Sequence, residues 1–89
     1  MKRNSDFLLR EVAGTVVVVP VGEAAASFSG MITMNSTGSF LWEQLEKEQT
    51  VETLTAALLE NYEVTSEKAR EDVEAFVAKL IPVGAILEQ

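Results

Sequence analysis

The spacing of apolar residues along the chain changes once, near Asn35. Before this position, short runs rich in β-branched residues are separated by glycine, which is typical of strands. After it, apolar residues recur every three or four positions, which is typical of amphipathic helices. The pattern therefore predicts a sheet in the first part of the chain and helices in the rest.

Two strands of the predicted sheet form a hairpin. Residues 7–12 and residues 15–21 flank Ala13-Gly14, a pair that favours a turn. The unbroken run of valines in the second strand indicates apolar surroundings on both of its faces. Pro20 has no N–H group to donate to a ladder, so this strand should end there or lie at a sheet edge.

A third strand is predicted over residues 30–34, and the sequence leaves its partner strand open. Residues 22–29 separate it from the hairpin. We interpret this segment as a loop, although it contains three consecutive alanines, which are good helix formers. The short apolar tail at residues 85–88 should fold back onto the core.

Three helices are predicted after the strands, each preceded by a residue whose side chain can accept from the free N–H groups of the first turn. The caps and helices are Asn35 before residues 36–47, Thr50 before residues 51–61, and Thr65 or Ser66 before a helix ending near residue 80. The third helix has the most regular apolar stripe, which consists of Ala69, Val73, Phe76, Val77 and Leu80.

The predicted order, three N-terminal β-strands followed by three α-helices, indicates an α+β fold in a single domain over residues 1–89. Three helices beside a small sheet are compatible with a winged helix-turn-helix-like arrangement. That arrangement hosts many functions, so it cannot name one by itself.

Two residue types that carry much of enzyme and metal chemistry are absent, since the chain has no cysteine and no histidine. Disulfides and thiolate metal sites are therefore excluded, and the commonest general base is missing. Glu71, Asp72 and Glu74 share one helix and are interpreted as a solvated face rather than a metal site. No glycine-rich phosphate loop or catalytic constellation is recognisable. We predict a protein that is not an enzyme and holds no metal or cofactor.

The net charge of −7 lies entirely in the second part of the chain. Residues 1–35 hold three basic and three acidic side chains, whereas residues 36–89 hold four basic and eleven acidic ones. Proteins bind nucleic acid by neutralising phosphates with Lys and Arg, so this distribution argues against nucleic acid as a partner. The acidic half either serves solubility alone or steers a basic partner towards the protein, and both interpretations stay open.

No apolar run approaches the roughly 20 residues that a membrane span needs. The basic start of the chain, at residues 1–6, is not followed by an apolar segment of signal-peptide type. We therefore expect a cytoplasmic protein that does not bind membranes.

The predicted sheet offers a surface for binding, because its edge strands present unpaired N–H and C=O groups. An extended peptide can add to such an edge, with main-chain bonds giving affinity and side-chain pockets giving specificity. A second copy of the chain could pair with the same edge. The residues alone favour peptide binding and self-association equally.

A set of motifs in a fixed order resembles the PqqD family. The hairpin over residues 7–20 looks like the opening of many members. The segment NSTGSFLWEQL, at residues 35–45, is similar to the family's central signature, in which an Asn leads into a small-residue turn and a helix start with an apolar residue and Trp. Further similar segments follow at residues 50–54, 62–64, 72–80 and 84–87. The resemblance spans essentially the whole chain.

The resemblance implies a module of the type called a RiPP recognition element, which holds the leader segment of a ribosomally made precursor peptide as an added strand. Such a module presents the peptide to a modifying enzyme, often a radical SAM protein that carries its own iron–sulfur clusters. The implied peptide-binding residues are Ser29, Gly30, Met31, Ile32, Thr33, Met34, Arg70, Val73, Glu74 and Val77. Val73 and Val77 also belong to the apolar stripe, so they either form the floor of a groove or contact the peptide.

Two other functions compete with the adaptor. A winged-helix transcription regulator would need basic side chains on its recognition helix, but residues 65–80 hold three bases and four acids. A structural module could instead form a homodimer by strand exchange through the loop at residues 22–29.

Overall fold

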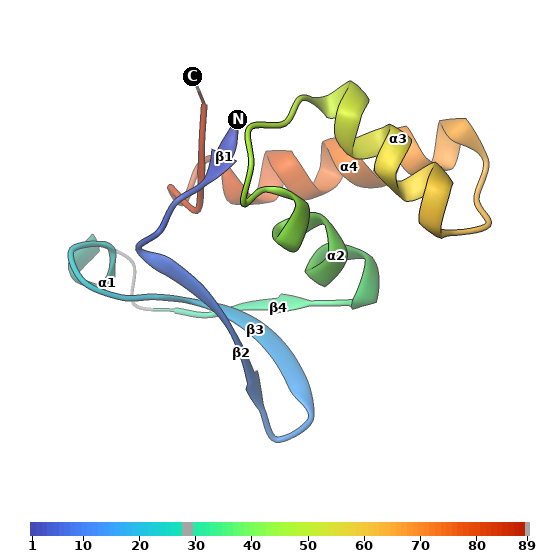
Figure 1. Ribbon diagram of the computed structural model, residues 1–89. Helices are drawn as coiled ribbons and strands as arrows, with labels where there is room; N and C mark the ends of the chain where they lie inside the picture. Colours follow the sequence, from blue (N-terminus) through green and yellow to red (C-terminus); the bar gives the residue numbers. More distant parts are fainter. Residues whose placement is uncertain (28–29, 89) are drawn as a thin grey trace.

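The computed structural model describes residues 1–27 and 30–88, which form an α+β fold with three helices on one side of a small sheet (Figure 1). In chain order the elements are β1 (Lys2–Arg3), β2 (Phe7–Val12), β3 (Thr15–Pro20), α1 (Ala24–Ser27), β4 (Ile32–Met34), α2 (Ser36–Gln44), α3 (Val51–Asn61), α4 (Ser66–Leu80) and β5 (Ile86–Leu87). The sheet has the strand order β2-β3-β4 with antiparallel ladders. The predicted α+β class and the three-stranded sheet are confirmed.

The hairpin forms as predicted, and its turn explains why. Ala13 and Gly14 both have positive φ angles, of 52° and 82°, as a type I′ turn requires. Glycine adopts this conformation without steric cost, and alanine is tolerated there at some cost. The backbone twist of such a turn matches that of the strands, so β2 and β3 pair along their whole length, from Phe7↔Pro20 to Val12↔Thr15.

The valine run of β3 is buried on both faces. Val17 and Val18 point to opposite sides of the sheet, and only 3% and 0% of their surfaces are exposed. Val18 belongs to the main core, in which the sheet packs against the helices. The prediction of apolar surroundings on both faces is therefore confirmed at the centre of the strand.

The third strand of the sheet, β4, is shorter than predicted and pairs with β3. The ladder runs from Val16↔Met34 to Val18↔Ile32. Continuing it would bring Gly30 opposite Pro20, which cannot donate a hydrogen bond. Gly30 and Met31 consequently lie outside the strand, and the predicted start at residue 30 is wrong.

The prediction of three helices is also wrong, because a fourth, α1, occupies part of the predicted loop. The N–H group of Ala25 donates to the carbonyl of Gly22 at 3.2 Å, and that of Ala26 donates to Glu23 at 3.1 Å. The three alanines thus follow their helix propensity over a single turn.

The caps of the three longer helices are Asn35, Thr50 and Thr65, as predicted. α3 and α4 also have the predicted bounds, whereas α2 ends at Gln44 instead of residue 47. Beyond Gln44 the backbone changes to bonds between residues three apart, such as Lys47 N–H to Gln44 C=O. This tighter winding ends the α-helix but keeps the chain turning.

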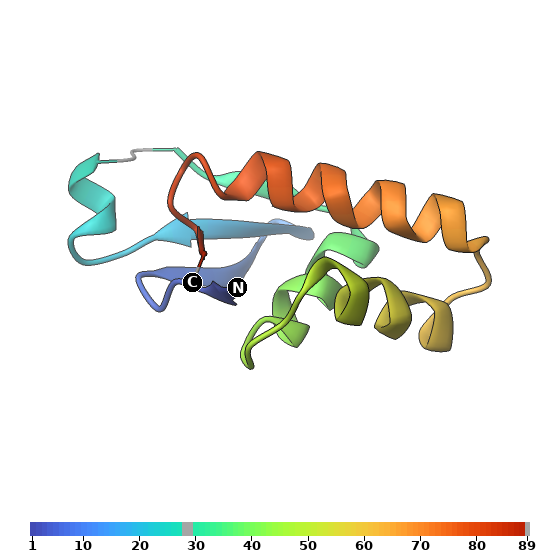
Figure 2. The same cartoon turned by 90° about the horizontal axis from the view of Figure 1, so that it is seen from above.

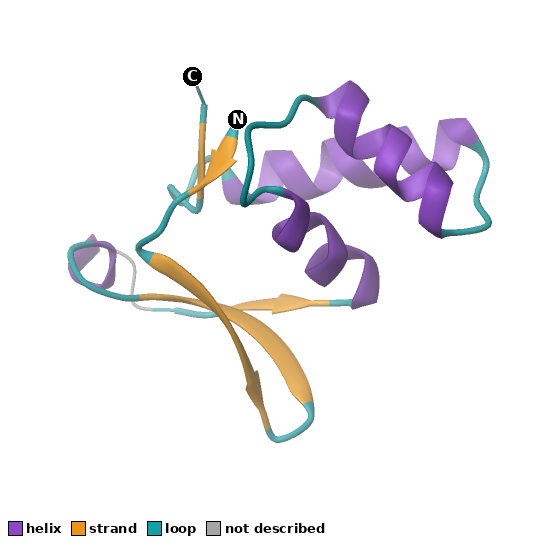
Figure 3. Cartoon of the chain, viewed as in Figure 1, coloured by secondary structure: helices purple, strands orange, loops and turns teal. Residues whose placement is uncertain are grey.

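The two ends of the chain meet in a ribbon that the sequence did not predict. β1 and β5 pair antiparallel, with Lys2 opposite Leu87 and Arg3 opposite Ile86 (Figure 3). Ala85 and Ile86 are buried in the core, so the predicted folding of the tail onto the core is confirmed. No helix in the part of the chain that the structure describes is long and apolar enough to span a lipid bilayer.

Candidate functional site

A groove lies between the free edge of the sheet and α4. Its volume is about 340 Å³, and it is open to solvent. The residues that line it come from three elements and the α2 cap: Thr33 and Met34 of β4; Asn35; Thr37, Gly38 and Leu41 of α2; and Lys68, Asp72, Ala75, Phe76 and Lys79 of α4. β4 is the last strand of the sheet on this side, and α4 runs beside it in the opposite direction (Figures 1 and 2).

The floor of the groove is apolar. Met34 and Leu41 belong to the buried core, and Phe76 packs against that core while remaining partly exposed. A half-covered aromatic ring beside two buried apolar side chains provides contact area that an apolar side chain of a ligand could complete.

The first turn of α2 closes one end of the groove, and Gly38 makes this close approach possible. A Cβ atom on Gly38 would lie 3.0 Å from Sδ of Met34 and 3.2 Å from Oδ1 of Asn35. The missing side chain lets the Asn35 side chain accept from the Gly38 N–H group at 2.7 Å. The cap of α2 and the position of β4 are therefore set by the same contact.

The two lysines that line the groove, Lys68 and Lys79, differ in their ion pairs. Nζ of Lys68 lies 3.0 Å from Oδ1 of Asp72 and 3.8 Å from Oε1 of Glu71. The hydrogen bond to Asp72 and the attraction of that carboxylate raise the pKa of Lys68. Lys79 is exposed and forms no ion pair with any residue that the structure describes. The groove therefore combines a lysine that is ion-paired within α4 with one that is unpaired among the described residues.

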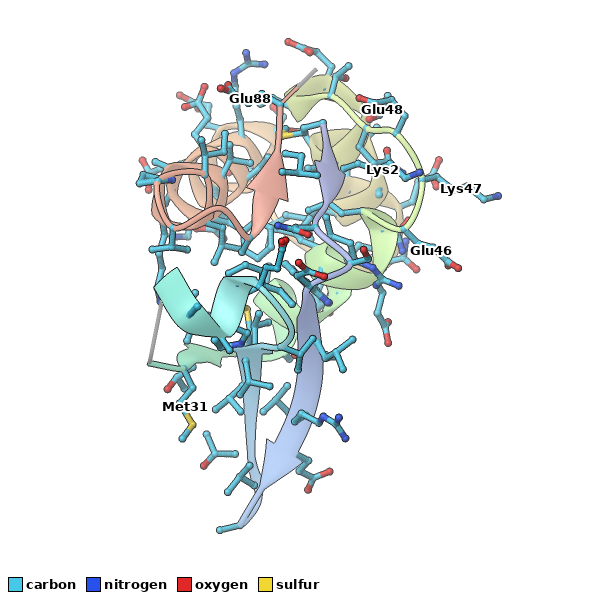
Figure 4. The ribbon with its side chains drawn as sticks, turned by 90° about the vertical axis from the view of Figure 1, so that its left-hand side faces the viewer. Lys2, Met31, Glu46, Lys47, Glu48 and Glu88 are labelled. Carbon is cyan, nitrogen blue, oxygen red and sulfur yellow. The ribbon has the colours of Figure 1, made fainter. Side chains whose placement is uncertain are left out.

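The strand residues predicted to bind a peptide divide into two groups. Ile32 and Met34 point into the core, with 7% and 8% of their surfaces exposed. Gly30, Met31 and Thr33 are exposed, and the Met31 side chain extends away from the helices (Figure 4). Met31 and Met34 therefore have opposite environments. Ser29 lies outside the described residues.

The predicted helix residues are not brought into the groove. Val73 is fully buried, which places it beneath the surface as part of the core. The guanidinium of Arg70 lies 3.4 Å from Glu52 of α3 and 3.3 Å from Glu74, so this side of α4 faces α3. Val77, also absent from the groove lining, is partly buried against the core.

The groove side of α4 carries residues that were not predicted as site residues. Asp72, Phe76 and Lys79 follow one another at helical spacing and all line the groove. Their spacing, i, i+4 and i+7, marks one face of a helix, and the signal was present in the sequence. Periodicity does not say which side of the buried stripe faces the sheet edge.

A second hollow lies at the opposite edge of the sheet, beside β2, with a volume of about 570 Å³. Arg3 and Trp42 are among its lining residues, and Arg3 is already engaged there. Its guanidinium donates to the Trp42 carbonyl at 3.2 Å and lies 5.9 Å from the centre of the indole ring. Within residues 1–27 and 30–88, no group of three or more acidic side chains is placed to hold a metal ion.

The chain matches the family model described as "Coenzyme PQQ synthesis protein D (PqqD)" over residues 14–86. Two solved structures share its fold at 18% sequence identity. "TbiB1 in Complex with the TbiA(beta) Leader Peptide" has a TM-score of 0.75 and covers 100% of this chain and 98% of its own. "Lasso peptide synthetase B1 complexed with the leader peptide" has a TM-score of 0.72, with 98% and 96% covered. No curated protein sequence matches significantly.

Proposed function

The chain belongs to the PqqD family, and on this basis we propose that it is a non-catalytic adaptor that binds the leader segment of a ribosomally made precursor peptide in the groove between β4 and α4. The observation that carries the proposal is a sheet edge with a partly exposed aromatic ring beside it. Both similar structures are complexes with a leader peptide.

The peptide binds as an added strand. Main-chain groups of β4 on the side away from β3 pair with the peptide backbone, which gives affinity without regard to sequence. Alternate side chains of an extended peptide point to opposite sides. One set enters the groove and contacts Phe76 and Leu41, and the other set points to solvent. Thr33 and Met31, which are exposed, contact the peptide from the strand side.

The helix side of this site differs from the residues that the resemblance implied. Asp72, Phe76 and Lys79 take the place of Arg70, Glu74 and Val77, whose side of α4 faces α3 or the core. Val73 is buried in the core. Of the implied strand residues, Ile32 and Met34 hold the edge in position through the core.

The adaptor presents its peptide to a separate modifying enzyme, and a radical SAM enzyme is the partner that we propose. Any iron–sulfur chemistry then belongs to that enzyme. We also propose that the hairpin and the three longer helices form a winged helix-turn-helix-like module, in which the peptide edge and the groove helix are adjacent.

The proposal is tested by calorimetric titration with synthetic leader segments of short peptides encoded beside the gene of this protein. Saturable binding at micromolar or tighter affinity is expected. Shifts of backbone NMR signals should concentrate at β4 and at Phe76 and Lys79. If every such segment fails to bind to protein shown to be folded, the adaptor function is wrong.

Strand addition has its own test, which leaves the protein unchanged. The peptide is N-methylated at one residue at a time, which removes one N–H donor. Affinity should fall by about 2- to 10-fold or more at every second residue, and little at the residues between, because only alternate N–H groups face β4. Uniform losses would contradict strand addition. The homodimer by strand exchange stays a prediction, and light scattering on the free protein measures whether it is a monomer or a dimer.

A further inference from the structure

The charges of the helical half of the chain are not spread evenly over its surface. Residues 36–89 hold four basic and eleven acidic side chains. Two of these four bases, Lys68 and Lys79, line the groove, but only one of the eleven acids, Asp72, does so. Among the lining residues, two positive charges therefore stand against one negative, on an acidic protein, and Glu71, which also contacts Lys68, lies outside the lining.

Of the two bases, Lys79 is the one available to a ligand. Lys68 is held at 3.0 Å by Asp72, so its charge is largely compensated within α4. Lys79 forms no ion pair within residues 1–27 and 30–88, and it lies one helical turn beyond Phe76. An apolar contact surface and an uncompensated ammonium group are thus neighbours on the same side of one helix.

We propose that the groove selects peptides in which an acidic side chain lies two residues from a large apolar one, with the acid paired to Lys79 and the apolar side chain packed on Phe76. This inference rests on the proposed peptide-binding function and specifies its ligand class. It also opposes the interpretation, open from the sequence alone, that the acidic half of the chain recruits a basic partner.

The spacing follows from the two backbones. Three residues along α4 separate Phe76 from Lys79 by about 4.5 Å. Two residues of an extended peptide, whose side chains point to the same side, are about 6.7 Å apart. The flexible lysine side chain covers the difference. A spacing of one residue would turn the acid away from the groove.

The net charge of −7 does not cancel this local preference. At physiological ionic strength, charges separated by more than about 8 Å are largely screened from one another. A carboxylate in contact with Lys79 therefore responds to Lys79 and to the neighbouring groove residues. Acidic side chains farther than this from Lys79 contribute little.

The test does not require knowledge of the natural peptide. A display library of random ten-residue peptides is selected on the wild-type protein, on Lys79→Glu and on Lys47→Glu. Lys47 is a matched control, because it carries the same charge, lines neither hollow and projects into solvent (Figure 4). Peptides enriched on the wild type and on Lys47→Glu should contain Asp or Glu two residues from an apolar residue. Lys79→Glu should instead enrich Lys or Arg at that position.

One enriched peptide is then synthesised in two versions, with Asp or with Asn at the selected position. The affinity of the protein for each version is measured by titration. On the wild type the change to Asn should weaken binding by about 2- to 5-fold, as for an exposed ion pair. On Lys79→Gln, a neutral variant that keeps most of the side chain, the same change should have no effect. The loss on the wild type should shrink as salt is added.

The possible failures are distinguishable. Enriched peptides that bind the groove but show no charge preference, and are unchanged on Lys79→Glu, would overturn the inference and leave the adaptor function standing. Enrichment of Lys and Arg on the wild type would overturn it as well. No enrichment on folded wild-type protein would contradict the adaptor function itself and the inference with it.

Discussion

The two sides of α4 carry similar residue types but use them differently. On the side that faces α3, Arg70 pairs with both Glu52 and Glu74. On the groove side, Lys68 pairs with Asp72, but Lys79 is unpaired among the described residues and Phe76 is only partly covered. The first side satisfies its charges within the protein, whereas the second leaves an aromatic ring and a positive charge for a ligand.

This difference shows that local composition does not identify the binding side of a helix. Both sides have a basic residue, an acidic residue and an apolar residue next to the buried stripe. The two sides of α4 differ in the element that faces each of them. α3 supplies Glu52 as a partner for Arg70, and the open edge of β4 supplies no charged side chain for Lys79.

The largest expected effect comes from a substitution that disturbs both sides of α4 at once. Leu80 lies on the stripe between them and is fully buried. Leu80→Ala should lower the free energy of unfolding by about 2–5 kcal/mol, because it removes buried methyl groups and leaves a cavity. Urea unfolding monitored by the fluorescence of Trp42 measures this loss. A loss below about 1 kcal/mol would show that α4 is not anchored through Leu80.

A substitution with a smaller expected effect distinguishes the groove side of α4 from the side that faces α3. Phe76→Ala should reduce the affinity for a bound peptide by about 10-fold or more, because the apolar floor is lost. Its cost in stability should be about 1–2 kcal/mol, less than for a fully buried phenylalanine.

Val77→Ala is the matched control on the other side, since Val77 is also partly buried but lies outside the groove. It should lower stability by roughly 1 kcal/mol and leave the peptide affinity within twofold. Equal losses of affinity in Phe76→Ala and Val77→Ala would mean that the two sides are not distinct.

The smallest expected effect is a pH dependence of the folding stability, which has opposite signs for the ion pairs on the two sides of α4. A backbone hydrogen bond at the start of α3, followed by Arg70, lowers the pKa of Glu52. Glu52 therefore stabilises the fold above the ordinary carboxyl range, near pH 4.3, and this contribution is lost as the pH falls through its folded pKa. The raised pKa of Lys68 gives a contribution to stability with the opposite pH dependence. Its contribution is present below the ordinary lysine range, near pH 10.4, and is lost as the pH rises through the folded pKa.

Melting temperatures measured across the pH range check this pair. Glu52→Gln should flatten the acidic arm of the profile, and Asp72→Asn should flatten the alkaline arm. Both changes should be smaller than the shift caused by Leu80→Ala. Glu60→Gln, at an exposed position of the same helix as Glu52, controls for the removal of one negative charge. Identical profiles for all variants would show that these pairs add nothing to stability.

The parts of the fold that depend on neighbouring residues were predictable. The turn at Ala13-Gly14 and the caps Asn35, Thr50 and Thr65 act within a few residues of their own position, and the structure confirms all of them. The boundaries of α3 and α4 follow from these caps and from the apolar stripe.

The parts that depend on distant contacts were not predictable. β1 and β5 are each two residues long and exist only because the ends of the chain meet. The length of β4 depends on Pro20, which lies on another strand. The choice between the two sides of α4 depends on how that helix is rotated against α3 and the sheet. The periodicity identifies which residues of α4 form the buried stripe. It does not indicate which of the two flanks of that stripe faces the sheet edge.

The pairing of β1 with β5 has a consequence for how this domain can be connected to other proteins. Paired strands lie about 4.8 Å apart, so the chain enters and leaves the domain at almost the same point (Figure 1). A domain of this kind can be inserted into a surface loop of a host protein without separating the two ends of that loop. The same geometry favours circular permutation, with new ends at the hairpin turn and a short linker across β1 and β5.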